Sequence, residues 1–278
     1  MAHTKKGRKV ALVAGLALVV LSVAMVWTYR KEIRSWYVFW LNFKALGKNE
    51  QSYPEYRHRE TGIVFVGIPG GTFEMGSPDS ETLRAAHEGP VHKVTLSPFL
   101  IAKFEVTQAE WKRVMGNNPS DFKGGTLPVE KVSWDDCKEF CEKTRLSLPT
   151  EAQWEYACRA GTSGPYSGTG KLDDMGWYRQ NSGGTTHPVG EKQPNQFGLH
   201  DMHGNVWEWC EDRFSEDFYS SAEASGLDPL CESGSENRVH RGGSWGNLAR
   251  ICRSAFRDLY DPSNRSNYLG LRPAWSSP

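Results

Sequence analysis

The hydrophobic and polar positions predict one apolar N-terminal segment followed by a domain of short strands. Val10–Trp27 contains no charged residue and has close to the length that a helix needs to cross a bilayer. Further along the chain, apolar runs are short and rich in β-branched and aromatic residues, which is typical of strands. They are Ile63–Val66, Thr72–Met75, Val94–Leu96 and Phe99–Ile101. Gly70-Gly71 predicts a hairpin turn between the first two.

Three helices are predicted by polar residues that can cap their first turns. Thr107 stands three positions before Glu110, Thr150 stands three positions before Gln153, and Ser133 opens the helix between them. In such a capping box, each side chain bonds to the other residue's backbone N–H, so that the first turn is stabilised. The helix after Ser133 carries its apolar residues on one face, which predicts that this face is buried.

Composition favours a loop-rich domain held by aromatic clusters. The chain of 278 residues has 11 tryptophans and 28 glycines, but only 38% hydrophobic residues. Residues 161–198 are mostly glycine, proline and polar residues, which predicts a long irregular excursion. Lysine and arginine together number 33, as do aspartate and glutamate. Because no basic surplus exists, we expect no nucleic-acid partner.

The N-terminal apolar run has two interpretations. A cleavable signal peptide would be cut near the small residues Ser22-Val23-Ala24. The run is longer than a usual signal core, however, and ends at Trp27, Tyr29 and Arg30, which are typical anchors at a membrane interface. We therefore favour an uncleaved transmembrane helix over residues 10–29.

Charge around that helix predicts its orientation. Four basic residues lie in the tail of residues 1–9, and the bias of positive charge favours a cytoplasmic N-terminus. We expect a single-pass membrane protein with an extracytoplasmic domain. Residues 30–60, first aromatic and then polar, read as a juxtamembrane linker, and the domain itself is expected at residues 61–275.

The segment His200–Trp209 combines acidic residues with a tight turn. Gly204-Asn205 is a turn dipeptide, around which the Asp201 and Glu208 carboxylates can converge with the main-chain carbonyls of Gly204 and Val206. Oxygen ligands alone suit a hard cation, and calcium is the cation that we expect. The alternative is a tryptophan-rich structural corner that holds no ion.

Ordered motifs extend this signal along most of the chain. They are Gly70–Ser77, Glu88–His92, Phe104–Thr107, Pro128-Val129 with Val132–Trp134, Leu148–Ala157, Gly204–Trp209, Arg241–Trp245 and Leu269–Arg272. Together they resemble the formylglycine-generating enzyme (sulfatase-modifying factor) family over residues 61–274. The resemblance implies an α+β fold, the irregular, loop-rich, C-type-lectin-like fold of that family, here preceded by one transmembrane helix. It is less informative about activity, because one fold hosts several functions.

The resemblance also identifies the candidate catalytic residues, Ser244 and Cys252. The family's oxidase uses two cysteines after its Gly-Gly-Ser motif, which bind copper and react with oxygen and a substrate thiol. Counted forward from Ser244, these positions are Asn247 and Cys252; counted back from later motifs, the loop is about three residues short and neither cysteine has a counterpart. Copper(I) prefers soft ligands, so with at least one cysteine missing we expect no copper cofactor.

The six cysteines predict disulfides, because their number is even and the domain is expected to be exported. The resemblance places Cys158 close to the segment around Cys252. It therefore implies a structural disulfide between the two as an alternative to a reactive Cys252.

The last part of the chain supplies the candidate ligand-binding residues. They are Trp245, Asn247, Arg253, Arg257 and Tyr260. Arginines in this segment suit an anionic partner, or else they pair internally with nearby acids such as Glu208 and Asp258. The segment resembles the ligand-binding segment of lectin-fold proteins diversified by retroelements, with a mixed set of side chains on a fixed framework. The mixed set is Asn247, Leu248, Ile251, Phe256, Leu259, Tyr260, Asn264, Asn267 and Tyr268.

Two functions remain open. One is a formylglycine-generating oxidase that converts a sulfatase cysteine to formylglycine. The other is a non-oxidase relative that binds a peptide or surface ligand in the family groove, and the missing cysteine favours it. The expected partners are a protein or peptide, with a sulfatase among the candidates, and the membrane through the N-terminal helix.

Overall fold

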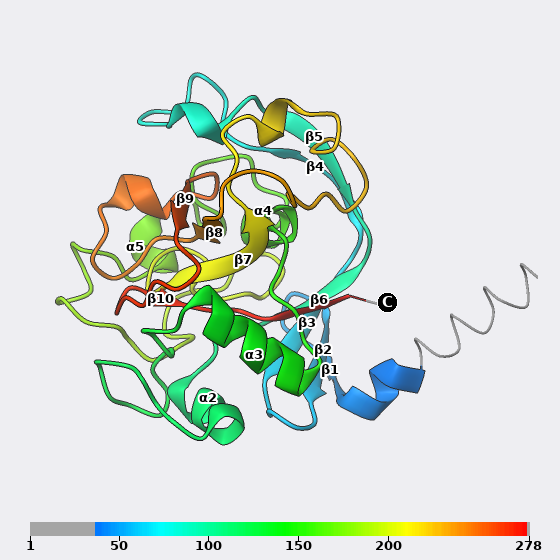
Figure 1. Ribbon diagram of the computed structural model, residues 1–278, viewed down its shortest axis with the longest axis vertical. Coiled ribbons are helices and arrows are strands. Elements are labelled where there is room, and N and C mark those ends of the chain that lie inside the picture. Colours follow the sequence, from blue (N-terminus) through cyan, green and yellow to red (C-terminus); the bar gives the residue numbers. More distant parts are fainter. Residues whose placement is uncertain (1–36, 277–278) are drawn as a thin grey trace, which may run out of the picture. The chain divides into compact units, whose positions relative to one another are not determined.

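The computed structural model describes residues 37–276 of the chain (Figure 1). The predicted cytoplasmic tail and transmembrane anchor, residues 1–29, lie outside the described residues. Among the residues that are described, no helix is long and apolar enough to cross a membrane. Residues 37–42 form a short helical segment, and residues 44–276 form a unit of their own, to which the following description applies.

A five-stranded sheet collects strands from both ends of this unit. Its order is β1 (Phe43–Lys48), β2 (Pro54–His58), β3 (Val64–Ile68), β6 (Phe99–Ala102) and β11 (Ala274–Ser276). The pairs β2–β3, β3–β6 and β6–β11 are antiparallel, and Val66 lies opposite Ile101 in the core. Two strands thus lie in the predicted linker of residues 30–60, so the domain begins earlier than the sequence indicated. Short polar strands at a sheet edge have too few apolar residues to be recognised from pattern.

The strand β4 (Gly71–Met75) pairs with β5 (His92–Leu96) in a separate two-stranded sheet. The predicted hairpin at Gly70-Gly71 is therefore wrong, since β3 and β4 belong to different sheets. Gly70 serves a different purpose: a Cβ at this position would lie 2.7 Å from the carbonyl oxygen of Leu96. The glycine permits two backbones to approach closely where the chain changes sheet.

A four-stranded sheet carries most of the sequence motifs. Its order is β10 (Leu269–Gly270), β7 (Trp207–Arg213), β8 (Arg238–Arg241) and β9 (Arg257–Tyr260). Strand β10 runs parallel to β7, and the other pairs are antiparallel. The short segment from β10 to β11 therefore adds one edge strand to this sheet and one to the five-stranded sheet.

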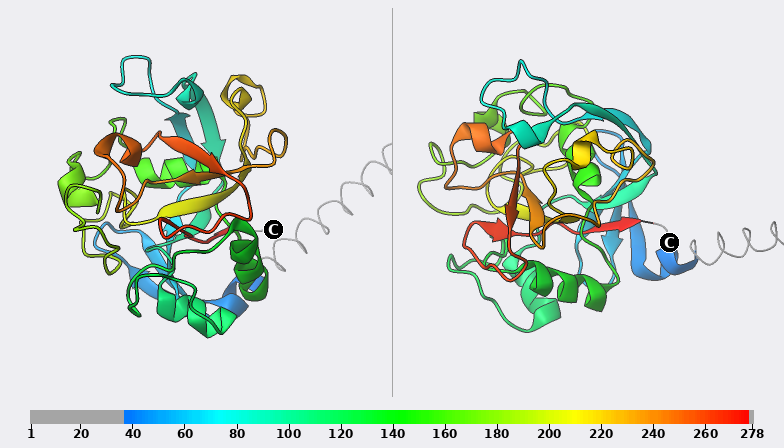
Figure 2. Two further views of the ribbon diagram at one scale, coloured as in Figure 1. Left: turned by 60° about the vertical axis from the view of Figure 1, so that its left-hand side comes forward. Right: turned by 45° about the horizontal axis from the view of Figure 1, so that its top comes forward.

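The predicted capping boxes are all present. They open α2 (Gln108–Met115), α3 (Trp134–Thr144) and α4 (Glu151–Arg159), and a shorter helix, α5, covers Leu172–Met175. The side chains of Thr107, Ser133 and Thr150 each accept a backbone N–H from the residue three positions on. Helices α2 and α3 lie side by side (Figures 1 and 2), with the rings of Trp111 and Phe140 stacked at 5.3 Å.

Helix α4 lies among β4, β5, β7 and β8, and its apolar residues join the core. Its two buried glutamates are held by arginines, two from distant segments and one from the end of the helix itself. Glu151 accepts from Arg241 Nη1 at 2.8 Å and from Arg257 Nη2 at 2.6 Å, and Glu155 accepts from Arg159 Nε at 2.8 Å. These guanidinium and carboxylate groups are buried, so each has lost its hydration. The attraction of its partner offsets the free-energy cost of that desolvation.

Candidate functional site

The Gly-Gly-Ser motif forms a tight turn between β8 and the loop that follows. Gly242 and Gly243 have φ values of 97° and 74°, which side-chain-bearing residues rarely adopt. A Cβ on Gly243 would lie 2.6 Å from Cys252 Sγ, so the turn packs directly on this cysteine. Beyond the turn, Ser244 Oγ donates to Asn247 Oδ1 at 2.6 Å. The two motif positions that the sequence singled out thus meet each other.

Trp245 extends this turn into an aromatic surface. Its ring stacks on Tyr268 at 4.6 Å and 20°, and Phe122 meets it edge-on at 5.3 Å and 90°. The indole N–H donates to the carbonyl of Asn267 at 3.0 Å. Trp245 is half-buried and Tyr268 is exposed. We call the three rings of Phe122, Trp245 and Tyr268 the Trp245 platform.

Three other segments fix the backbone beneath the platform. The carbonyl of Trp245 accepts from Ser182 Oγ at 2.8 Å, and its N–H donates to the carbonyl of Asn205 at 2.8 Å. The N–H of Arg179 donates to the carbonyl of Asn247 at 2.9 Å. A site built on so many backbone bonds is preorganised, with its side chains held by the scaffold.

The thiol of Cys252 lies beneath this surface in a form unsuited to reaction. Cys252 is fully buried, and burial raises its pKa to about 12, although the nearby N–H of Ser244 opposes the shift. A thiol with this pKa is protonated at neutral pH, and the thiolate is the nucleophilic and metal-binding form. Asn247 supplies an amide at the position where the family's first cysteine is expected.

The predicted Cys158–Cys252 disulfide is absent, and all six cysteines are free thiols. His203 contacts both cysteine segments. Its Nε2 accepts from Ser167 N–H at 3.0 Å and lies 3.7 Å from Cys158 Sγ, while its Nδ1 lies 2.8 Å from the carbonyl of Cys252. With Nε2 as an acceptor, Nδ1 carries the proton and donates to that carbonyl. The imidazole ring thus joins the segments that the resemblance implied a disulfide would join.

The predicted calcium ligands span the turn before β7 and the start of that strand, and their side chains differ in availability. Glu208 accepts from Arg272 Nη2 at 2.8 Å and from the indole N–H of Trp154 at 2.6 Å, so both its oxygens are engaged. Asp201 Oδ2 accepts from Gly190 N–H at 2.7 Å, whereas its buried Oδ1 has no hydrogen-bond partner among the described residues.

A third carboxylate, Glu105, completes this acidic cluster and was not predicted. Its oxygens accept from Asn205 Nδ2 at 2.6 Å and from Val206 N–H at 3.0 Å. Burial, then the charges of Asp201 and Glu208, raise the pKa of Glu105 well above its usual value, and burial raises the pKa of Asp201 to about 6. Three buried carboxylates thus share one guanidinium, that of Arg272.

The cluster therefore fits calcium in part. One unpartnered carboxylate oxygen and an excess of buried negative charge favour a cation, whereas Arg272 already neutralises Glu208. The residues described contain no group of three or more histidines, cysteines, aspartates or glutamates arranged to hold a metal ion. The predicted set has only two such side chains and completes itself with backbone carbonyls, so calcium stays a prediction.

The remaining candidate ligand-binding residues lie elsewhere. Arg253 is buried in ion pairs with Glu88 at 2.6 Å and Glu81 at 2.5 Å, and Arg257 is buried against Glu151. Both take the internal role that the sequence left open, with partners from far earlier in the chain. Tyr260 is 40% exposed on β9, where its ring lies 4.8 Å from that of His240.

Phe122 is the platform residue that sequence reasoning missed. It lies in the irregular stretch between α2 and α3, and no motif there marks it. This stretch is held in place by Glu130, whose Oε1 accepts a hydrogen bond from the backbone N–H of Phe122 at 2.9 Å. Such a contact follows from tertiary structure and leaves no periodic trace in the sequence.

Comparison with known proteins finds matches over most of this chain. A family model described as "Sulfatase-modifying factor enzyme 1-like domain" matches residues 50–277. The formylglycine-generating enzyme of Thermomonospora curvata is 30% identical, over 80% of this chain and 96% of its own. The chaperone protein LppX of Paenibacillus barcinonensis is 28% identical, over 86% of this chain and 98% of its own. Treponema denticola variable protein 1 superimposes with a TM-score of 0.71 and 31% identity, over 81% of this chain and 99% of its own.

These relatives carry the names of an enzyme, a chaperone and a variable protein. Proteins with this fold thus have different kinds of function. The function of this chain therefore has to be inferred from the residues at its site.

Proposed function

Since this chain belongs to the family of sulfatase-modifying factor enzyme 1-like domains, we propose that it is a non-oxidase relative that binds a peptide or surface ligand at the Trp245 platform. The single observation that carries this proposal is that neither Asn247 nor Cys252, the two positions expected to hold the reactive cysteines, offers a thiolate. Asn247 is bonded to Ser244 Oγ, and Cys252 is buried as a protonated thiol. Copper(I) and oxygen chemistry in this family needs two thiolates, and neither position supplies one.

Loss of the thiolates leaves the binding surface intact. Trp245 and Tyr268 offer large, rigid rings, and the Asn247 amide, two residues after Trp245, is held by Ser244 Oγ. Aromatic rings contribute contact area at low cost in conformational entropy, and amides adapt their hydrogen bonds to a partner. This combination supports recognition of a peptide or of another molecule's surface.

The oxidase alternative is tested directly by chemistry. The full chain is incubated with a Cys-x-Pro-x-Arg peptide, oxygen and a reductant, with and without copper(I), and the aldehyde is detected by mass spectrometry. We expect no conversion. Copper-dependent conversion that is lost in Cys252→Ser would replace this proposal with the formylglycine-generating oxidase, the activity that the name of the Thermomonospora curvata relative states.

Binding is tested with the same peptide and with a library of short peptides, by following tryptophan fluorescence. A bound peptide should be released when Trp245 is replaced by alanine, with a loss of at least about tenfold in affinity. The matched control is Trp275→Ala, since Trp275 is also partly exposed but lies on β11, outside the platform. Equal losses in the two variants, or affinity unchanged in Trp245→Ala, would contradict a role for the platform.

We further propose that the domain is exported and anchored by residues 10–29, and that calcium binds in the turn of Asp201 and Glu208. The anchor is supported by the uncharged run and its aromatic end. Calcium is supported by the unpartnered Asp201 Oδ1 and by three buried carboxylates that share Arg272. When bound, the ion would neutralise the charge of Asp201 and would be held also by the neutral carbonyl oxygens of Gly204 and Val206, with Glu208 shared with Arg272.

A further inference from the structure

The segment of residues 214–237, which joins β7 to β8, carries charge of one sign only. It has six carboxylates and no lysine, arginine or histidine. The six are Glu216, Asp217, Glu223, Asp228, Glu232 and Glu236. Two of them are engaged within the fold, because Glu236 pairs with Arg213 at 3.0 Å and Asp228 accepts from Ser97 Oγ at 2.6 Å. The other four have no ion pair among the described residues.

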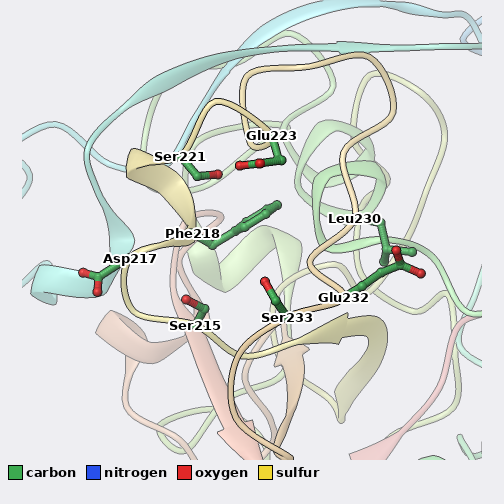
Figure 3. A pocket seen from close by; sticks show the side chains of 8 residues that line it. All are labelled: Ser215, Asp217, Phe218, Ser221, Glu223, Leu230, Glu232 and Ser233. Carbon is green, nitrogen blue, oxygen red and sulfur yellow. The ribbon is translucent and has the colours of Figure 1, made fainter.

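This segment lines an open hollow of about 530 Å³, and three of the four acidic residues without an ion pair are among its lining residues: Asp217, Glu223 and Glu232. Figure 3 shows the ring of Phe218 reaching across its middle, with Ser221 and Glu223 on one side and Ser233 on the other. Leu230 adds a second apolar side chain, and no basic residue is among those that line it.

Residues adjacent to those that line the hollow are buried and hydrogen-bonded. Next to Phe218, Tyr219 is 1% exposed and its hydroxyl donates to Glu151 Oε1 at 3.2 Å. Next to Glu232, the N–H of Cys231 donates to the buried Asp212 Oδ1 at 2.9 Å. Next to Glu223, Ala224 is fully buried and its N–H donates to Ser221 Oγ at 3.2 Å. Each wall therefore has an anchor in the core, and a preformed site loses less entropy on binding.

The chemistry of the walls selects the class of ligand. A bare metal ion does not fit, since no three acidic side chains among the described residues converge as ligands and the volume far exceeds that of an ion. An ammonium or guanidinium group on an alkyl stem does fit. The charged head meets carboxylates and serine hydroxyls, and the stem and the cation's face pack against Phe218 and Leu230.

We propose that this hollow binds an organic cation through Phe218, Glu223 and Glu232. The cation is either a lysine or arginine side chain of a partner chain or a free aliphatic amine, since both present the same chemistry. The hollow shares no residue with the Trp245 platform, so the proposal stands independently of the proposed function.

The first test uses the unaltered full chain in detergent and measures binding calorimetrically. Three probes are compared: a capped Gly-Lys-Gly peptide, the same peptide with norleucine in place of lysine, and 1,5-diaminopentane. The cationic probes should bind at least about tenfold more tightly than the norleucine peptide, and their affinity should fall as salt is added. Tighter binding of the peptide identifies a side chain as the source, and tighter binding of the diamine identifies a free amine. Equal binding of lysine and norleucine peptides, or no binding of any probe, overturns the proposal.

The second test assigns binding to the hollow. The double variant Glu223→Gln, Glu232→Gln should weaken binding of the cationic probes by at least about tenfold, and Phe218→Leu by about threefold. The control is Glu142→Gln, because Glu142 is exposed on α3, outside the segment. An equal loss in the control would show that binding depends on overall charge and would overturn the assignment. Thermal unfolding of each variant verifies that it is folded. If a variant does not fold, the comparison of the lysine and norleucine peptides on the unaltered chain still tests the proposal.

Discussion

Asn247 and Arg253 show how far single residues can be interpreted before the fold is known. The sequence placed Asn247 three positions after Ser244, and the structure joins their side chains at 2.6 Å, because a contact within one turn is set by local spacing. Arg253 was a candidate for contact with an anionic ligand or for an internal ion pair. Its partners Glu81 and Glu88 lie 172 and 165 positions earlier, and no local pattern reveals such a pairing. The Trp245 platform divides in the same way: Trp245 and Tyr268 were among the residues singled out, whereas Phe122 comes from a distant loop.

The first residue-scale prediction concerns Cys252. Replacing it by serine should lower the free energy of unfolding by about 1–3 kcal/mol, because a hydroxyl would be buried where the thiol donates only weakly, to the Leu248 carbonyl at 4.0 Å. Cys231→Ser is the control and should cost less, since Cys231 Sγ already donates to the Ser233 carbonyl at 2.9 Å. Urea unfolding measures both variants.

The same protein permits a check on its thiols. Without reductant, the denatured chain should present six titratable thiols to a thiol reagent. Four thiols, together with a loss of about 2–5 kcal/mol in Cys252→Ser, would restore the disulfide with Cys158.

The second residue-scale prediction concerns pH. Burial, then the charge of Glu151, raises the pKa of Asp212 from 3.8 to about 7. Between these values the folded chain holds a proton that the unfolded chain has lost. This residue therefore contributes stability that is fully present below about pH 4 and is lost as the pH rises to about 7. Asp212→Asn should flatten the decline over this range.

Unfolding midpoints measured at four pH values test this sign. The exposed Asp261 gives the control variant Asp261→Asn, which should leave the decline as steep as in the unaltered chain. Parallel curves for the unaltered chain and Asp212→Asn would show that Asp212 titrates normally in the folded state.

Among the elements, α4 shows the difference between what local sequence specifies and what packing adds. Its start follows from the Thr150–Gln153 capping box, and all three capped helices were predictable for this reason. The partners of strands were not, because β3 and β4 are neighbours in sequence but belong to different sheets. Pattern shows that a stretch is a strand; which strand it pairs with depends on contacts formed across the whole chain.

At α4 the buried ion pairs can be tested against an exposed one. Arg241→Met should lower the free energy of unfolding by about 3–5 kcal/mol, because Glu151 and Glu155 would lose a buried counter-charge. The control Arg265→Met removes the half-exposed pair with Asp136 at 2.7 Å, and should cost less than about 1 kcal/mol. Similar costs for the two variants would mean that Arg257 and Arg159 suffice to neutralise the helix.

The turn before β7 provides the calcium prediction. If calcium binds Asp201 and its neighbouring carbonyls, millimolar calcium should raise the melting temperature and a chelator should lower it. Asp201→Asn should abolish the calcium response. A melting temperature that is indifferent to both additions would leave Arg272 as the only counter-charge of the three carboxylates.

For the whole molecule, the resemblance predicted the fold class and nearly all of the domain, since the motifs occur in order over residues 61–274 and the family model matches residues 50–277. The N-terminal boundary was less accurate, because β1 and β2 are short and largely polar. The hollow of residues 214–237 was not foreseen at all. It arises where two anchored loop segments face each other, and no motif encodes that.

The topology of the whole protein is predicted by its N-terminal run. If residues 10–29 are an uncleaved anchor, the mature protein should stay in the membrane fraction after an alkaline wash and should begin at or next to Met1. Protein sequencing of the N-terminus measures this. A soluble product that starts near residue 25 would establish the signal-peptide interpretation instead.

The long separations of the buried ion pairs determine when the chain can fold during its own synthesis. Glu151 and Glu155 precede Arg241 by 90 and 86 positions, and Glu208 precedes Arg272 by 64. Strands β10 and β11, which complete both larger sheets, also come last. While the polypeptide is still emerging from the ribosome, Glu151 and Glu208 lack these arginine partners, and Glu155 has only Arg159 of its own helix, so burial of the three carboxylates is costly. We therefore expect a product that terminates before Arg272 to be less stable than the full chain and more readily degraded by quality-control proteases.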